Sequence, residues 1–296
     1  MKRCAFLSMD SLDDFVCYDH LLHQPLEELG WSVDTLSWRT TDTDWNDYEA
    51  VIIRSPWDYQ QDAGAFLRLL EAIDRSSARL ENALSLVRWN IDKRYMRDLE
   101  QAGIAIVPTV WGQGDRLPRT ISSLFEEAPE LVIKPCISAN ADDTYRIASP
   151  SWAETSARIA PRFTGRDWML QPYMPAIATE GEFSLFYFDG GYSHAVLKTP
   201  AQGDFRVQEE HGGRLRSVSP DARLRETGDR VMAGITTLHQ CPLYARVDLV
   251  RDGSIFRLME VELIEPSLYF NMDPDSARRF AEAFDARMNR RDARPA

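Results

Sequence analysis

Short apolar runs alternate with a helix-like stretch in the first part of the chain. The runs "RCAFLSM" (3–9), "WSVDTLSW" (31–38) and "YEAVIIRS" (48–55) predict strands. Between the first two runs, "YDHLLHQPLEELG" (18–30) predicts a helix that ends at Gly30. This order of strands and helices is typical of a mostly parallel sheet in a Rossmann-like α/β layer. Ligands of such sheets gather at the carboxyl ends of the strands.

The segment "RSPWDY" (54–59) follows the third of these strands and is a candidate substrate site. The candidate contacts are Arg54, Ser55 and Asp58, with Trp57 and Tyr59 as walls. A guanidinium group such as that of Arg54 can hold a carboxylate through two parallel hydrogen bonds. Because Pro56 also favours a simple turn, a purely structural role for the segment stays open.

From residue 88 the pattern changes, which predicts a new unit. "VRWNIDKRYMRDLEQAG" predicts one helix that ends at Gly103 and carries Lys93 in its first turns. "ELVIKP" predicts a strand that places Lys134 at its end, before a small polar loop with Ser138 and Asn140 as candidate substrate contacts. An ammonium group beside such a loop can hold a phosphate group. Lys93 alone would be read as a solvated surface lysine, and "IKP" alone is a weak signal for a phosphate site.

The run "LMEVELIEPS" (258–267) places three glutamates among apolar residues. A strand alternates faces with period two, so Glu260 and Glu262 point to one side. The preceding "LYARVDLVRDGSIFRLME" predicts a hairpin that turns at Asp252-Gly253. In one of the possible registers, Asp248 and Arg246 share the face of the two glutamates.

Three carboxylates on one strand face repel one another. Two like charges about 4 Å apart cost on the order of 4 kcal/mol at an effective dielectric constant near 20, so a positive group is expected there. Oxygen ligands without His or Cys suit Mg²⁺, which proteins hold through one or two carboxylates together with substrate phosphates. A solvated acidic sheet face is the alternative at this stage.

Composition narrows the class of protein. The chain has 296 residues, of which 44% are hydrophobic and 27% charged, and its length suggests about two domains. The net charge of -12 argues against broad nucleic-acid binding. No apolar run has the length of a membrane span or a signal-peptide core. The four cysteines lack C-x-x-C spacing, so we expect reduced thiols. His20 and His23 lack a third ligand, so we expect no histidine metal site. We expect a cytoplasmic location.

Between these regions, "DWMLQP" predicts a strand, and "EFSLFYF" with "YSHAVLK" predicts a hairpin around Asp189-Gly190. Lys198 and Arg206 follow in the direction of the acidic hairpin. Lysines that neutralise phosphates and carboxylates that bind a bridging metal are the parts that phosphoryl transfer requires.

With these motifs the chain resembles the ATP-grasp ligases, in their glutathione-synthetase-like branch, over roughly residues 88–270. The resemblance implies two ATP-phosphate lysines, Lys93 and Lys134, and an adenine hinge in "LQPYMP" formed by Gln171, Tyr173 and Met174. It also implies Glu182 near the ribose, Asp248, Glu260 and Glu262 as ligands of two Mg²⁺ ions, and Arg206 and Lys198 as catalytic groups.

The implied fold is α/β (α+β): an amino-terminal Rossmann-like domain (1–87) and two α+β subdomains (88–170 and 171–296) that clamp ATP. Many relatives have Glu-x-Asn where this chain has Glu260-x-Glu262, and a glycine-rich lid where this chain has the glycine-free "SANADDTYR". "RSPWDY" and "SHAVLK" resemble a bacterial subgroup that includes the ligase forming D-cycloserine.

The resemblance implies an ATP-dependent carboxylate–amine ligase that acts on an amino acid or small peptide through an acyl phosphate. Two alternatives stay open: an intramolecular ring-closing ligase, and a nucleotide-binding protein without turnover. The expected partners are small molecules, with no nucleic acid and no membrane, and a homo-oligomer is possible.

Overall fold

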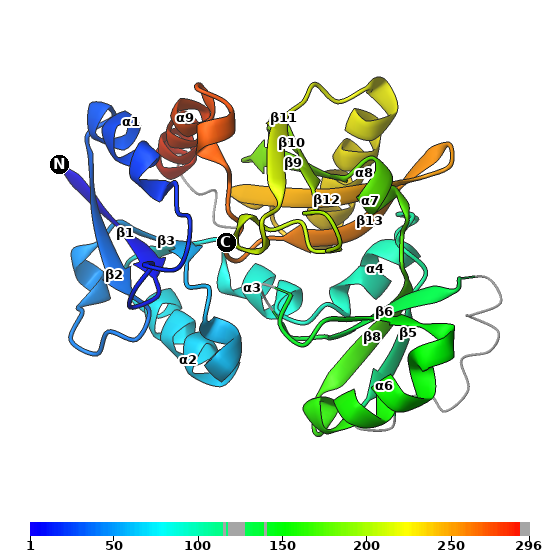
Figure 1. Cartoon of the computed structure of the whole chain (residues 1–296). Helices are drawn as coiled ribbons and strands as arrows, with labels where there is room; N and C mark the ends of the chain where they lie inside the picture. The colour runs from blue at the N-terminus through cyan, green and yellow to red at the C-terminus, as the bar shows by residue number, and fades with distance from the viewer. Residues whose placement is uncertain (115–116, 118–127, 139–140, 291–296) are drawn as a thin grey trace.

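The computed structural model describes residues 1–114, 117, 128–138 and 141–290, and within them the chain forms three sheets (Figure 1). The first sheet is parallel and has the order β2 (Trp31–Ser37), β1 (Lys2–Ser8), β3 (Ala50–Ser55), β4 (Arg79–Glu81). The parallel sheet predicted from the alternation is therefore confirmed, with each of the three predicted strands in place.

The other two sheets are antiparallel. The second has the order β5 (Val110–Gln113), β8 (Asp167–Pro172), β6 (Glu130–Pro135), β7 (Tyr145–Ala148). The third has the order β11 (Arg214–Ser217), β10 (Gly191–Thr199), β9 (Glu182–Phe188), β12 (Tyr244–Asp252), β13 (Ile255–Glu262). Both predicted hairpins, β9–β10 and β12–β13, are present. Asp189, Gly190 and Gly253 adopt the positive φ that their tight turns need.

Helices cover the sheets and connect them. They are α1 (His23–Glu28), α2 (Ala63–Asp74), α3 (Leu84–Asn90), α4 (Tyr95–Gln101), α6 (Trp152–Ile159), α7 (Ala176–Thr179), α8 (Ala222–Leu238) and α9 (Ser276–Asn289). The predicted helix over 18–30 is shorter than expected, since a 3-10 turn (Asp19–Leu22) precedes α1. No helix among the described residues is long and apolar enough to span a bilayer.

The single helix predicted from residue 88 is two helices, α3 and α4. The side chain of Asp92 accepts a hydrogen bond from the backbone N–H of Arg94 at 2.9 Å, in the turn between the helices. An aspartate that bonds the backbone two residues on favours a turn over a continuous helix. Lys93 therefore lies in this turn, where its own N–H donates to the Cys136 carbonyl at 2.8 Å, and not in the first turns of a helix.

The last helix returns to the first sheet, so the two ends of the described chain share one hydrophobic core. In Figure 1 the red α9 lies beside the blue α1. Phe280 and Phe284 of α9 are fully buried in the same cluster as Phe6 and Trp31. The rings of Trp31 and Phe284 lie 4.7 Å apart, and the Trp31 indole donates to Asp285 at 2.9 Å.

The strand that carries the predicted metal ligands, β13, is at the edge of the third sheet. The backbone of Leu258 bonds that of Ala105 and Val107 there, but the end of the strand, from Val261 on, has no neighbouring backbone segment on that side within the described part of the chain. Side chains take the place of such a segment. Asn90 donates to the Val261 carbonyl at 2.9 Å and accepts from the Leu263 N–H at 3.0 Å. The Tyr95 hydroxyl also bonds both backbone groups of Val261. The acidic strand is thus fixed in position by α3 and α4.

Candidate active site

The acidic hairpin adopts the register in which its charged residues share a face. Asp248 lies opposite Glu260, and Arg246 lies opposite Glu262, across the antiparallel pair β12–β13. The period-two interpretation of the sequence is therefore confirmed at the level of the strand face. A register shift follows Asp248, so the pairing beyond it is offset by one residue.

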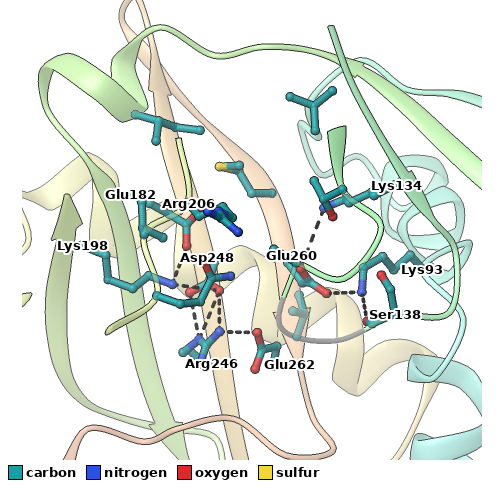
Figure 2. A pocket seen from close by; sticks show the side chains of 18 of the residues that line it. Lys93, Lys134, Ser138, Glu182, Lys198, Arg206, Arg246, Asp248, Glu260 and Glu262 are labelled. Carbon is teal, nitrogen blue, oxygen red and sulfur yellow. Dashed lines mark hydrogen bonds and ion pairs between the residues drawn. The ribbon is translucent and has the colours of Figure 1, made fainter. Parts of the chain in front are cut away.

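Protein cations neutralise the carboxylates on this face (Figure 2). Arg246 forms ion pairs with both Asp248 and Glu262, and Lys198 pairs with Glu182 at 2.5 Å and with Asp248 at 3.4 Å. Burial acts to raise the pKa of Asp248, but Arg246 and Lys198 more than offset it, so the pKa lies below its usual range. Asp248 is therefore held as an anion.

Glu260, on the same face, contacts the two predicted phosphate lysines. Its carboxylate lies 2.7 Å from the Lys93 ammonium group and 3.9 Å from that of Lys134. These two charges outweigh the effect of burial and lower the pKa of Glu260. Lys134 responds in the opposite direction, because burial and then Lys93 lower its pKa although Glu260 raises it. Lys93 also donates to the Ser138 carbonyl at 2.8 Å.

At two further glutamates, nearby positive charges do not offset the effect of burial on the pKa. Burial raises the pKa of Glu262 to about 7 even though Arg246 lies against it. Burial, and then the charge of Glu262, raise the pKa of Glu265 to about 8. The side chain of Glu265 hydrogen-bonds to Tyr59. Both glutamates therefore face a region where an additional positive charge would be favourable.

One pocket gathers most of the predicted site residues, and its walls come from the second and third sheets and the loop after β3. The predicted residues that line it are Lys93, Lys134, Ser138, Gln171, Tyr173, Met174, Glu182, Lys198, Arg206, Asp248, Glu260 and Glu262, with the predicted walls Trp57 and Tyr59. Three of the four lysines in the chain are among them. Lysine is therefore concentrated at this site in a chain that otherwise uses arginine.

The predicted substrate contacts after β3 need correction, because Arg54, Ser55 and Asp58 do not line the pocket. Arg54 is 1% exposed and donates to Asp19 at 2.8 and 3.1 Å. Ser55 bonds Ser8, and Asp58 accepts hydrogen bonds from Trp38 and Arg39. The alternating pattern shows where the strand ends and the loop begins. It does not show that other residues of the protein already form hydrogen bonds with these polar side chains.

Two predictions for the loop after β6 have different outcomes. Ser138 lines the pocket, but its hydroxyl donates to the Pro135 carbonyl at 3.2 Å, and its own carbonyl accepts from Lys93. Asn140 lies outside the described residues. Arg206 lines the pocket from the loop after β10 and pairs with Asp204 at 2.7 Å.

Sequence reasoning assigned no site role to Arg246 and Glu265. Arg246 was placed on the acidic face, but its pairing with two of the three carboxylates needs the register between β12 and β13. Glu265 was visible as the third glutamate of "LMEVELIEPS", but it lies beyond the end of β13, where the period-two pattern no longer assigns a direction.

The carboxylates do not by themselves form a complete metal-binding site. Among the described residues, no group of three or more His, Cys, Asp or Glu side chains is gathered closely enough to hold a metal ion. Asp248, Glu260 and Glu262 instead line one side of the pocket with cations between them. This donor set suits an ion that takes only one or two carboxylates and obtains its other oxygen ligands from a bound phosphate and water, as Mg²⁺ does.

Comparison with known structures identifies the fold. The structure of D-cycloserine synthetase DcsG matches with a TM-score of 0.86 and 30% identity, and the match covers 97% of this chain and 99% of that chain. D-alanine–D-alanine ligase from Bacillus anthracis, solved in complex with ATP, matches with a TM-score of 0.67 at 15% identity over 96% of this chain and 95% of that chain. The ATP-grasp ligase PsnB, solved with Mg and ADP, matches with a TM-score of 0.65 at 12% identity over 97% of this chain and 98% of that chain. The fold is thus that of the ATP-grasp ligases.

Sequence comparison agrees. The amino-terminal domain model of D-cycloserine synthetase DcsG matches residues 4–82. The cycloserine biosynthesis protein DcsG of Streptomyces lavendulae is 34% identical over 273 residues, which is 88% of this chain and 90% of that protein. The chain belongs to the ATP-grasp ligases, in the group that contains DcsG. It is an ATP-dependent ligase that forms a C–N bond, and the nucleotide-binding protein without turnover is not supported.

Proposed function

We propose that the enzyme joins a carboxylate to an amine through an acyl phosphate, with an amino acid or a small peptide as its substrate. The observation that carries this proposal is the pocket in which two lysines, a third lysine with two arginines, and three strand carboxylates meet. ATP-driven activation of a carboxylate is mainly a matter of positioning and of charge stabilisation, and these groups supply both.

The nucleotide part of the proposal assigns Lys93 and Lys134 to the phosphates. Gln171, Tyr173 and Met174 would border the base, and Glu182 would lie near the ribose. The pocket wall contains buried polar atoms that could form hydrogen bonds with such a ligand. The Tyr173 hydroxyl and the Gln208 amide oxygen are buried, line the pocket, and have no hydrogen-bond partner among the described residues. Buried polar atoms of this kind are expected to find a partner in the bound state.

The metal part of the proposal assigns Asp248, Glu260 and Glu262 to two Mg²⁺ ions. When bound, Mg²⁺ neutralises charge on phosphate oxygens. Glu260 now pairs with Lys93 and Lys134, so binding of Mg²⁺ with ATP would be an exchange of partners. The lysines would then pair with phosphate in place of the carboxylate, and the carboxylate would bind the metal. Each of these buried charges would keep a partner of opposite charge.

Lys198 and Arg206 are proposed to stabilise negative charge on the reacting carbonyl group. Lys198 is 3% exposed and is held by Glu182 and Asp248, so its ammonium group is fixed in the pocket wall. Arg206 reaches the pocket from a loop and pairs there with Asp204, a partner that it would exchange for the reacting group.

A second candidate is intramolecular ring closure, favoured by the identity of 34% to DcsG and by the match of residues 4–82 to the amino-terminal domain of that synthetase. Both candidates share the activation step and differ only in where the amine comes from. A homo-oligomeric state and a cytoplasmic location remain predictions.

The test is a screen for ADP release with L- and D-amino acids and their derivatives, followed by mass analysis of the products. A product mass equal to two substrates less one water supports intermolecular ligation, and a mass equal to one substrate less one water supports ring closure. Absence of ADP release with every compound would contradict the proposed substrate class.

Replacement of Lys134 by alanine tests the nucleotide assignment directly. We expect Lys134→Ala to weaken Mg-ATP binding by about 10- to 100-fold, since charge-assisted hydrogen bonds contribute about 1.5–3 kcal/mol. The measurement is calorimetric titration of Mg-ATP. The control is Lys2→Ala, which removes the one lysine outside the pocket, where it pairs with Asp285. Equal affinity in wild type and Lys134→Ala would remove Lys134 from the phosphate site.

A further inference from the structure

Glu265 is an acidic group of the pocket that lacks a cation of its own. Asp248, Glu260 and Glu262 each form an ion pair within 4 Å. None of the ion pairs formed by the described residues includes Glu265, whose side chain bonds the Tyr59 hydroxyl. The nearby ammonium group of Lys93 is already used by Glu260 and the Ser138 carbonyl. Burial raises the pKa of Glu265 to about 8, and a cationic group of a ligand bound beside it would lower that pKa and stabilise the carboxylate form.

The backbone around Glu265 is held firmly. The Trp57 indole N–H donates to the Glu265 carbonyl at 2.8 Å, and the Arg54 guanidinium donates to the Pro266 carbonyl at 3.2 Å. Trp57 and Tyr59 are 8% and 4% exposed, and both line the pocket beside Glu265. The segment after β3 therefore fixes the backbone of Glu265 and places two aromatic residues in the same part of the pocket wall. Arg54 acts here through Pro266 and not on a ligand.

The location of Glu265 fits one end of an amino acid. It follows Glu262 by three residues, which corresponds to at most about 10 Å of extended chain. The α-carboxylate and α-ammonium groups of an amino acid are only two bonds apart through the α-carbon, so both groups can be recognised in one pocket. The other pocket glutamates without an ion pair are less suited, because Glu210 is exposed and Glu209, which bonds Tyr18 at 3.2 Å, lies in the loop after β10 and not next to the strand of Glu262.

We propose that Glu265, between Trp57 and Tyr59, binds the α-ammonium group of the carboxylate substrate and so determines specificity for amino acids over simple carboxylic acids. This inference rests on the proposed function, since it concerns the substrate whose carboxylate is activated. A charge-assisted hydrogen bond between the two groups gives a preference of about 10- to 100-fold.

The experiment measures binding without turnover. The full chain, with Mg²⁺ and the non-hydrolysable analogue AMPPNP, is titrated calorimetrically with a panel of L- and D-amino acids and D-cycloserine. The amino-bearing compound that binds most tightly is then compared with the same molecule in which hydrogen replaces the amino group. We expect the wild type to prefer the amino compound by about 10- to 100-fold.

Three variants distinguish recognition from support of the fold. Glu265→Gln should lose the preference, while its Tm and its Kd for AMPPNP stay at the wild-type values. Glu265→Asp keeps the charge on a shorter side chain and should recover part of the preference. Glu226→Gln, the same change at an exposed position on α8 outside the pocket, should leave the preference unchanged.

Several results would overturn the inference: an unchanged preference in Glu265→Gln, a wild type that binds the compound without the amino group equally well, or no binding by any member of the panel. A joint fall of Tm and AMPPNP affinity in Glu265→Gln would make Glu265 a structural residue. Because binding is read without ADP release, failure of the ligase assay alone leaves this test intact, and the two proposals can fail separately.

Discussion

His194 is a buried histidine outside the pocket, and its neighbours hold it in the neutral form. It is 5% exposed and stacks on Phe186, with ring centroids 4.2 Å apart. Its Nε2 lies 3.1 Å from the Leu268 carbonyl, which requires a donor, and its Nδ1 lies 2.9 Å from the Ser193 hydroxyl. Burial lowers the pKa of His194 to about 4, although Asp273 acts in the opposite direction and Arg279 assists burial.

This arrangement predicts a loss of stability in mild acid. Between pH 6.5 and about 4 the unfolded chain binds a proton at His194 that the folded chain does not, so the free energy of unfolding falls as pH decreases through this window. The shift corresponds to about 3 kcal/mol. We expect His194→Phe, which keeps the ring stack, to lose that part of the pH dependence in urea unfolding at pH 7 and pH 4.5.

The exposed His20 provides the control, because His20→Gln should keep the wild-type pH dependence. The comparison uses the difference between the two pH values within each variant, since loss of the donor to Leu268 lowers stability at both. An identical difference in wild type and His194→Phe would show that other groups are responsible for the acid sensitivity.

At the same scale, the sequence predicted which residues share a strand face but not which residues neutralise one another. Glu260 and Glu262 followed from the period of two, which is a local property, whereas Asp248 joins their face only through the register of the hairpin. The pairing of Arg246 with two of them depends on the register between strands, and Lys93 comes from a different part of the chain. Arg54 was misplaced for the same reason, because its partner Asp19 lies 35 residues away.

The end of the edge strand β13 depends on side chains for its backbone hydrogen bonds, and Asn90 is the clearest case. Asn90→Ala removes the partner of the Leu263 N–H, whereas the Val261 carbonyl keeps its bond from the Tyr95 hydroxyl. One buried group left without a partner costs about 1–3 kcal/mol, so we expect a loss of that size in the free energy of unfolding. Activity should fall as well, because Glu260 and Glu262 lie on this strand.

Urea unfolding measured by circular dichroism checks this expectation, with Gln101→Ala at an exposed position of α4 as the control. A loss below about 0.5 kcal/mol in Asn90→Ala, similar to that of an ordinary surface substitution, would mean that water replaces the amide at the strand edge.

Most strands were predicted well, because alternation and turn residues such as Asp252-Gly253 are local signals. The helices were predicted less well. The break between α3 and α4 depends on a hydrogen bond from the Arg94 N–H to the Asp92 side chain, which competes with a continuous helix. Helical periodicity continues across this turn in the sequence, so the pattern alone could not detect the break.

At the scale of the whole molecule, α9 completes the core of the first sheet. Phe284 is fully buried against Trp31 at the opposite end of the chain. We expect Phe284→Ala to lower the free energy of unfolding by about 3–5 kcal/mol. The exposed Glu282→Ala, on the same helix, is the control for helix propensity. Differential scanning calorimetry checks both, and equal Tm values for the two variants would mean that α9 contributes little to the core.

The arrangement of the three sheets could not be derived from the pattern of residues, since contacts such as Trp31 with Phe284 join positions separated by most of the chain. It was anticipated only through the resemblance of the motifs around Lys93, Lys134 and the acidic hairpin to a known family. The domain boundaries at residues 87 and 170 remain predictions.

The return of α9 to the first sheet has a consequence for synthesis of the protein. The strands of this sheet leave the ribosome long before the helix that covers Phe6 and Trp31. At about 5–20 residues per second, the apolar face of the sheet waits roughly 15–55 s for its cover. A nascent chain should therefore stay sensitive to protease near Trp31 until α9 has left the ribosome, and early protection would show that another segment shields the face meanwhile.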